Sequence, residues 1–304
     1  MTTLVRARGL TKSYSGIQAL DRVDLDIPKG RVGLVGANGA GKTTLFRLLL
    51  GLSRPTAGTV EVCGIAVASD PIGVRSRIGY MPEHDCLPLD QTAADVVATF
   101  GELGGLPVRA ARQRASEVLD LVGLDEARFR PVGGFSTGMR QRTKLAQAIV
   151  ADPELVLLDE PTAGLDPSGR EEMLALVARL GGFGISVLLA THLLDDVAQV
   201  CDHVVMLDAG KLVTDAPTTS LLQRTGTVTV DVGPGGTALL ARALTSLGLT
   251  VAVNEGATVE VTVAGDAELD TIRDAVVDLG LPLYRLTNRL TSLDDVFVHG
   301  AKTT

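Results

Sequence analysis

Hydrophobic and polar residues alternate along the first thirty positions of the chain, for example over Leu4–Arg8 and Val23–Ile27. Alternation with a period of two is typical of strands with one buried face, and glycines and Pro28 interrupt these stretches. The pattern predicts an antiparallel β-layer. A short apolar stretch, Arg31–Val35, then leads into a glycine-rich loop and a helix-forming segment, Lys42–Leu50. A strand, a loop and a helix in this order form the first half of a parallel α/β unit.

Between about residues 88 and 151 the pattern becomes helical, and we expect a helical subdomain there. Two later stretches, Leu155–Leu158 and Ser186–Ala190, are short and apolar, and Val204–Leu207 adds a further strand. Short apolar runs of this kind are typical of parallel strands that are buried on both faces. Together with Arg31–Val35 they predict the parallel core sheet of an α/β domain.

The pattern changes after Ala216. The predicted elements are, in order, the strand Thr227–Val232, the helix Thr237–Leu247, the strands Thr250–Val253 and Thr258–Val263, the helix Ala267–Leu279 and the strand Leu283–Leu286. The order β-α-β-β-α-β suggests a small α+β domain of ferredoxin-like fold. We therefore expect two domains, over residues 1–220 and 221–304.

The charge balance is acidic, with a formal net charge of −8 over 304 residues and a pI of about 5.1. Binding to nucleic acid through a general basic field needs clustered Lys and Arg, so nucleic acid is not an expected partner. Nothing at the N-terminus resembles a signal peptide, and no apolar run reaches the ~18 residues that span a bilayer. We expect a soluble, cytoplasmic chain whose cysteines (Cys63, Cys86 and Cys201) are buried thiols in a reducing compartment.

A glycine-rich loop follows the strand at residues 31–35 and opens a helix. Its pattern, two glycines spaced by four residues and then Lys and a hydroxyl residue, is that of a phosphate-binding P-loop. Glycines let backbone N–H groups turn toward phosphate oxygens, and the N-terminus of the helix attracts the anion. Lys42 would reach the β- and γ-phosphates, and the Thr43 hydroxyl would bind Mg²⁺. The predicted nucleotide-binding residues are Gly36, Ala37, Asn38, Gly39, Ala40, Gly41, Lys42, Thr43 and Thr44.

P-loops occur in kinases, GTPases and motors alike, so the class of enzyme depends on other residues. The strand Leu155–Leu158 ends in two carboxylates, Asp159 and Glu160. An Asp at the tip of a parallel strand can hold Mg²⁺ through its water shell, and the next carboxylate can act as general base toward the attacking water. Apolar strands that end in Asp-Glu also arise by chance. After a P-loop, however, this pair predicts an active site with Asp159 at the metal and Glu160 as the catalytic base.

The segment Phe135–Gln141 lies upstream of Asp159, and its Ser136 is well placed to cap a helix that runs to Ala151. With the P-loop and the Asp-Glu pair, this segment resembles the signature motif of the ATP-binding-cassette (ABC) family of ATPases. The resemblance covers about residues 4–215 and implies an ABC-type P-loop cassette that binds and hydrolyses ATP with Mg²⁺. The residues implied at the γ-phosphate are Ser136, Thr137, Gly138 and Met139, and a plain helix cap is the alternative role for Ser136.

Three further positions match the family. Asp166 ends the segment Ala163–Asp166, which resembles the D-loop. His192 follows an apolar strand and resembles the switch histidine that contacts the γ-phosphate in catalysis, although a lone histidine is more often structural. Tyr14 resembles the aromatic residue that stacks on adenine, and packing within the β-layer is its alternative role.

Two departures from the family pattern carry information. Glu83 stands where the family has a glutamine; a carboxylate can still ligate Mg²⁺ but cannot donate a hydrogen bond. The signature has Phe135, Thr137 and Met139 in place of its usual residues. Both features resemble the branch of ABC exporters that includes antibiotic-resistance and other drug or lipid efflux ATPases with a separate permease. The segment Leu293–Phe297 is similar to the ending of those subunits.

The resemblance also implies partners. ABC signature residues complete the nucleotide site of the opposite subunit, so we expect a homodimer in which Ser136 of one copy faces the phosphates held by Lys42 of the other. A separate integral-membrane permease would hold the chain at the cytoplasmic face of the cell membrane. The region Leu87–Gly105 would form the groove that receives a permease helix.

Two other classes compete with an exporter subunit. An importer ATPase would usually keep the glutamine that Glu83 replaces, and its C-terminal extension would more often be a β-rich barrel. A soluble, non-transport ABC ATPase would usually fuse two cassettes, or carry zinc modules or long coiled coils. The sequence favours export over both, and the cargo is not readable from it.

Overall fold

The computed structural model describes residues 3–221, 224–233, 235–253, 258–263 and 265–290. The chain divides into two compact units, Met1–Thr218 and Thr219–Thr304. We call them the cassette unit and the C-terminal unit. The division falls two residues before the boundary predicted from the sequence, and each unit is described by itself.

The N-terminal part of the cassette unit is a four-stranded antiparallel sheet of order β2-β1-β4-β5. Its strands are β1 (Thr3–Tyr14), β2 (Ile17–Pro28), β4 (Ala57–Val62) and β5 (Ile65–Ala66). Buried and exposed residues largely alternate along Val23–Ile27 of β2, which leaves one face of the sheet in the core. The predicted antiparallel layer is confirmed, with strands longer than the sequence indicated and a third and fourth strand added.

The second sheet of this unit has six strands in the order β10-β9-β3-β8-β7-β6. Its strands are β3 (Arg31–Val35), β6 (Ile78–Met81), β7 (Leu155–Asp159), β8 (Ser186–Thr191), β9 (His203–Asp208) and β10 (Lys211–Pro217). All neighbours are parallel except β9 and β10. Every residue of β7 and β8 is buried, as the apolar runs predict. The register aligns the carboxyl ends of β3, β6, β7 and β8 along one edge, where α/β proteins build their sites.

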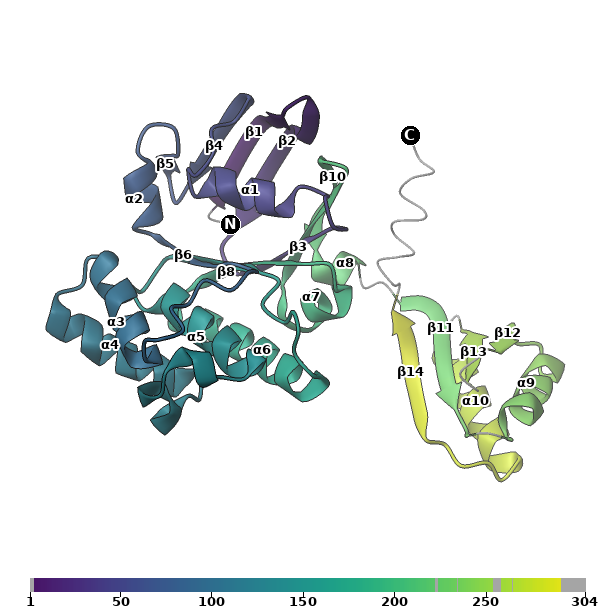
Figure 1. Ribbon diagram of the computed structural model, residues 1–304. Coiled ribbons are helices and arrows are strands. Elements are labelled where there is room, and N and C mark those ends of the chain that lie inside the picture. Colours follow the sequence, from purple (N-terminus) through teal and green to yellow (C-terminus); the bar gives the residue numbers. More distant parts are fainter. Residues whose placement is uncertain (1–2, 222–223, 234, 254–257, 264, 291–304) are drawn as a thin grey trace. The chain divides into compact units, whose positions relative to one another are not determined.

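Helices complete the unit, as Figure 1 shows. The α-helices are α1 (Lys42–Leu49), α2 (Pro71–Arg75), α3 (Ala93–Leu103), α4 (Val108–Leu121), α5 (Thr137–Ile149), α6 (Pro167–Leu180) and α7 (Leu194–Val200), and α8 (Thr218–Leu221) spans the division between the two units. Short 3-10 helices span Asp125–Phe129, Val132–Gly134 and Gly181–Phe183. Leu45, Phe46 and Leu49 of α1 share one core with strands of both sheets. Helices α3, α4 and α5 gather into the predicted helical subdomain.

The C-terminal unit contains β11 (Arg224–Asp231), α9 (Thr237–Ser246), β12 (Val251–Val253), β13 (Val259–Thr262), α10 (Asp266–Asp278) and β14 (Arg285–Leu290). Its sheet is antiparallel and has the order β12-β13-β11-β14, which is the ferredoxin-like arrangement predicted from the order of elements. Val228, Val230 and Val261 of the sheet pack against Leu240 and Ile272 of the helices. The segment Leu293–Phe297, which resembles an exporter ending, lies outside the described residues.

The three cysteines do not share one environment. Cys201 is buried, Cys63 is half-buried and Cys86 is exposed, so the prediction of three buried thiols is wrong for Cys63 and Cys86. Cys86 lies in the loop after β6 rather than in a strand, which explains its exposure.

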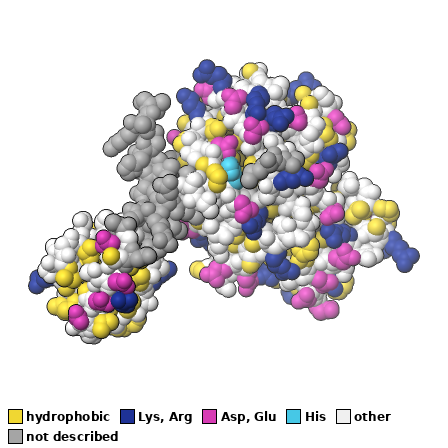
Figure 2. Space-filling model, turned by 180° about the vertical axis from the view of Figure 1, so that it is seen from behind, with side chains coloured by type: hydrophobic (Ala, Val, Ile, Leu, Met, Phe, Trp, Pro, Cys, Tyr) yellow, Lys and Arg dark blue, Asp and Glu magenta, His cyan; other side chains and the backbone are white. Residues whose placement is uncertain are grey.

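Among the described residues, every helix is too short or too polar to span a lipid bilayer. Figure 2 shows Lys and Arg side chains interspersed with Asp and Glu on the face that it draws.

Candidate functional site

The glycine-rich loop connects the carboxyl end of β3 to the N-terminus of α1. A Cβ atom on Gly36 would lie 2.4 Å from the carbonyl oxygen of Leu207, so only glycine fits there. Gly41 adopts a φ of 109°, in the left-handed region that favours glycine, just before the first helical residue. Lys42 folds back over this loop, and its Nζ donates to the carbonyl oxygens of Gly36 at 2.6 Å and Ala37 at 3.5 Å.

The loop lines a cavity of about 360 Å³. We call it the nucleotide cavity; its lining residues are Ala19, Ala37, Asn38, Gly39, Gly41, Lys42, Thr43, Thr44, Glu83, Asp159 and Glu160. The structure therefore brings together most of the predicted loop with the three carboxylates predicted at its edge. Ala19, from β2, is a lining residue that no sequence motif indicated.

Asp159 and Thr43 face each other across the cavity. The Thr43 hydroxyl donates to Oδ2 of Asp159 at 3.2 Å. Burial raises the pKa of the Asp159 carboxyl, the hydrogen bond from Thr43 lowers it, and the nearby charge of Glu83 raises it further. Tyr80 of β6 is also close, and burial together with Asp159 raises its pKa to about 12. A hydroxyl and two carboxylates are oxygen donors of the kind that Mg²⁺ prefers, so the residues fit that ion.

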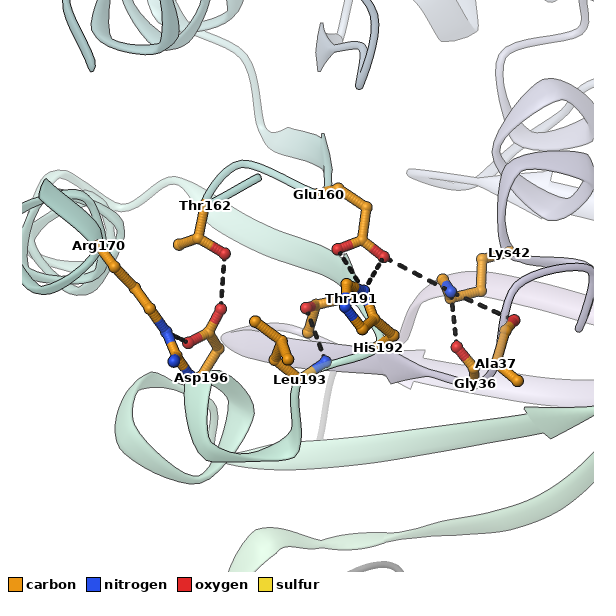
Figure 3. A network of polar contacts seen from close by, with 10 residues as sticks. All are labelled: Gly36, Ala37, Lys42, Glu160, Thr162, Arg170, Thr191, His192, Leu193 and Asp196. Atoms are coloured by element: carbon orange, nitrogen blue, oxygen red, sulfur yellow. Dashed lines mark hydrogen bonds and ion pairs between the residues drawn. The ribbon is translucent and has the colours of Figure 1, made fainter. Parts of the chain in front are cut away.

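Glu160, the next residue along the chain, is buried beside Lys42 and His192 (Figure 3). Its Oε1 lies 3.6 Å from Lys42 Nζ, and both of its carboxylate oxygens lie 3.0–3.1 Å from His192 Nδ1. Its backbone adopts a φ of 48°, and its N–H donates to the carbonyl of Ala190 at 2.9 Å. A left-handed non-glycine residue costs on the order of 1–3 kcal/mol and persists where its surroundings hold it, often at active sites.

Figure 3 shows a second polar network beside this pair. Asp196 of α7 is fully buried. It accepts a hydrogen bond from the Thr162 hydroxyl at 2.7 Å and one from Arg170 Nε at 2.5 Å. Thr162 follows Glu160 by two residues and Asp196 follows His192 by four. The network therefore ties together the two loops that carry Glu160 and His192.

The signature residues lie elsewhere in the chain. Ser136 caps α5, its hydroxyl accepting from the backbone N–H of Met139 at 3.2 Å. Asp166 caps α6 in the same way through Gly169, at 3.3 Å. Both lie in a cavity of about 470 Å³, the signature cavity, lined by Ser136, Thr137, Gly138, Met139, Arg142, Gly164, Leu165, Asp166, Ser168, Gly169 and Glu172. Among the described residues, this cavity shares no lining residue with the nucleotide cavity.

Tyr14 lies at the end of β1 and is 38% exposed, so it does not pack in the β-layer. Nζ of Lys12 lies 4.7 Å from the centroid of its ring. Tyr14 is not among the described residues that line the nucleotide cavity. The role of Tyr14 at adenine stays a prediction.

Comparison with known proteins decides the family. The ABC transporter family matches residues 20–163. A daunorubicin resistance ATP-binding protein from Streptomyces coeruleorubidus is 37% identical over 98% of this chain and 95% of its own length. The chain belongs to the ABC transporter family. A Nod factor export ATP-binding protein from Ralstonia nicotianae is 32% identical to this ABC ATPase over 98% of the chain and 93% of that protein.

Solved structures agree. The ATP-binding subunit of an ABC transporter superposes on this ABC ATPase with a TM-score of 0.66 and 27% identity, covering 74% of this chain and 94% of that one. A dimeric ATP-binding cassette in a post-hydrolysis state, bound to ADP and phosphate, superposes with a TM-score of 0.65 and 25% identity. The match covers 71% of this chain and 99% of that one. The protein is an ATP-binding and ATP-hydrolysing subunit of this family.

Sequence reasoning missed several residues that the site uses. Asp196, Arg170 and Thr162 form a network that spans elements far apart in the sequence, and no local pattern indicated it. Lys144 was missed as well. It lies on α5 between the buried residues Gln141 and Ala148, at helical spacing, so a lysine on the apolar side of a predicted helix was a usable signal.

Proposed function

We propose that this ABC ATPase powers export of a drug, lipid or similar substrate through a separate permease, acting as one half of a head-to-tail homodimer. The observation that supports this proposal most strongly is that one chain has two separate cavities. Lys42, Asp159 and Glu160 line one, and Ser136 with the rest of the signature lines the other. A head-to-tail pair would join the nucleotide cavity of each copy to the signature cavity of its partner.

In the nucleotide cavity we assign Glu160 as the base that takes the proton of the attacking water. Its carboxylate is buried beside the loop that would cradle the phosphates. His192 Nδ1 contacts both of its oxygens and would hold the carboxylate in one orientation. Lys42 is within 3.6 Å of the same carboxylate and would turn from the Gly36 carbonyl toward the β- and γ-phosphates.

Thr43, Asp159 and Glu83 are the residues we propose to hold Mg²⁺. When bound, the ion would neutralise phosphate charge that develops during transfer. Thr43 and Asp159 already point at one another, and Glu83 reaches the same cavity from the loop after β6. The exposed backbone N–H groups at the start of α1 would bind phosphate oxygens.

In the signature cavity, Ser136, Thr137, Gly138 and Met139 form the first turn of α5 and its cap. We propose that they bind the γ-phosphate held by the partner copy, as a helix N-terminus attracts an anion. Asp166 lines the same cavity and would lie at the dimer interface. ATP would thus hold the dimer closed, and hydrolysis would release it.

The remaining assignments rest on the relatives. Daunorubicin resistance and Nod factor export are named for proteins that match nearly the whole chain, which supports export of a drug, lipid or similar substrate. We propose that a permease on a separate chain places the protein at the cytoplasmic face of the membrane, without nucleic acid as a partner. The C-terminal unit is proposed to be an accessory or regulatory domain.

Replacement of Glu160 by Gln tests the assignment of the base. We expect Glu160→Gln to lower ATP turnover by about 100-fold or more while the affinity for a fluorescent ATP analogue stays within about twofold. Size-exclusion chromatography with light scattering should show the variant as an ATP-dependent dimer. Wild-type turnover in the variant, or a monomer at saturating ATP, would contradict the proposal.

The direction of transport is tested with inverted membrane vesicles that contain the chain and a co-expressed permease. ATP-dependent accumulation of substrate inside inverted vesicles would support export. Accumulation only in right-side-out vesicles, or only with a binding protein, would favour the importer alternative.

A further inference from the structure

Lys144 is a charged residue that the catalytic assignment leaves unexplained. It lies on α5, and only 1% of its surface is exposed. Its Nζ donates to three successive carbonyl oxygens, those of Pro82 at 2.7 Å, Glu83 at 2.9 Å and His84 at 3.4 Å. An ammonium group has three N–H donors, so these bonds use all of them.

The three carbonyls belong to the loop that follows β6. This loop carries Glu83, which also lines the nucleotide cavity. The backbone of the loop therefore bonds to one ammonium group from α5, in the helical subdomain, while Glu83 lines the nucleotide cavity. These bonds are part-buried, and hydrogen bonds from a charged donor are stronger than neutral ones, so loss of the ammonium would remove the contacts that fix the backbone of the loop.

The same helix begins at the signature. Ser136 caps α5, and Lys144 lies eight residues further on, about 12 Å along the helix axis. One helix and one side chain therefore connect the first turn of α5 to the loop that carries Glu83. Burial lowers the pKa of the Lys144 ammonium, and the nearby charges of Asp85, Glu83 and Asp159 raise it.

We propose that Lys144 is a positioning residue that holds the backbone of Glu83 so that its carboxylate stays at the metal edge of the nucleotide cavity, and that couples this carboxylate to the signature helix. The inference rests on the proposed function, in which Glu83 is a metal ligand. Lys144 itself is not among the described residues that line the nucleotide cavity.

The direction in which Mg²⁺ binding changes when Lys144 is replaced distinguishes a positioning role from an effect of its charge. The Lys144 ammonium repels a divalent cation, so loss of its charge alone would tighten the binding of Mg²⁺ in the cavity. Loss of positioning would release Glu83 and weaken that binding. The two accounts therefore predict opposite changes for Lys144→Met.

The measured quantity is the factor by which Mg²⁺ tightens the binding of a fluorescent ATP analogue to the full chain, compared with binding in EDTA. We expect Lys144→Met to reduce this factor about fivefold and to leave the affinity in EDTA within about twofold. Lys29→Met is the matched control, because Lys29 is an exposed lysine in the turn before β3, at the opposite edge of the sheet, and it should keep the wild-type factor.

A double variant tests whether Lys144 acts through Glu83. We expect Lys144→Met combined with Glu83→Ala to give the same factor as Glu83→Ala alone. Additive losses would contradict action through Glu83. If Lys144→Met does not fold, Lys144→Gln, which keeps two N–H donors, is measured against the same criteria.

The outcomes distinguish this inference from the proposed function. An unchanged or larger factor in Lys144→Met, with a reduced factor in Glu83→Ala, would overturn the role of Lys144 alone. An unchanged factor in Glu83→Ala would overturn the metal role of Glu83, and with it the basis of the inference.

Discussion

His192 Nδ1 lies 3.1 Å from Oε1 and 3.0 Å from Oε2 of Glu160. The pairing of β7 with β8 sets Asp159 opposite Ala190, so Glu160 and His192 each lie just past the end of neighbouring strands. The carboxylate is buried, and the side chain of the histidine is 51% exposed. The contact thus places an exposed imidazole against a buried carboxylate that lines the nucleotide cavity.

Removal of this imidazole should impair turnover more than binding. We expect His192→Ala to reduce kcat for ATP by about 100-fold, because Glu160 loses the contact that orients it, while analogue affinity changes less than about threefold. His203→Ala is the control, since His203 pairs with Asp215 at the β9–β10 edge of the sheet. Equal losses in both variants, or a loss in affinity alone, would contradict an orienting role for His192.

The buried carboxylate of Asp196 should be a large contributor to stability. Its removal would leave Arg170 and Thr162 without their acceptor, and we expect Asp196→Ala to lower the free energy of unfolding by about 3 kcal/mol. Asp195→Ala, at the exposed neighbouring position, should cost less than about 1 kcal/mol. Urea unfolding of both variants measures the difference, and similar midpoints would show that the network adds little.

The head-to-tail arrangement can be tested by mixing inactive chains. Lys42→Ala and Ser136→Ala should each lower turnover, the second through a composite site as well as the loss of about 1 kcal/mol of helix capping. In a mixed dimer, the unchanged Lys42 of one copy would face the unchanged Ser136 of the other. We expect the mixture to hydrolyse ATP faster than either variant alone. A mixture no more active than its parts would argue that each chain completes its own site.

Alkaline pH should destabilise the fold through Cys201. Burial raises the pKa of this thiol from 9.0 to about 12, so above pH 9 the unfolded chain loses a proton that the folded chain keeps. The folded state binds more protons, and its stability therefore falls as the pH rises from 9 to about 12, by at most about 1.4 kcal/mol per pH unit from this group. Urea unfolding at pH 8.5, 9.5 and 10.5 measures this slope. Cys201→Ala should flatten it; identical slopes in both proteins would exclude Cys201 as the cause.

The local sequence determined the elements with a clear period or a buried apolar run. The helical subdomain and the strands β7 and β8 follow from such patterns, since periodicity reports which side of an element avoids water. The ferredoxin-like unit also follows from the order of its elements. The short strands β4, β5 and β6 were not predicted, because they depend on pairing with strands that are distant in the sequence.

The sequence by itself also determined which residue types could bind phosphate, hold a metal and take a proton, because those chemistries need particular side chains at particular spacings. Only the tertiary structure decided which of them meet. The parallel register of β7 and β8 brings Glu160 to His192, and the fold of the loop after β6 brings the carbonyl of Glu83 to Lys144. A sequence pattern reports that a position is buried, but the partner of a buried polar group depends on how distant elements pack.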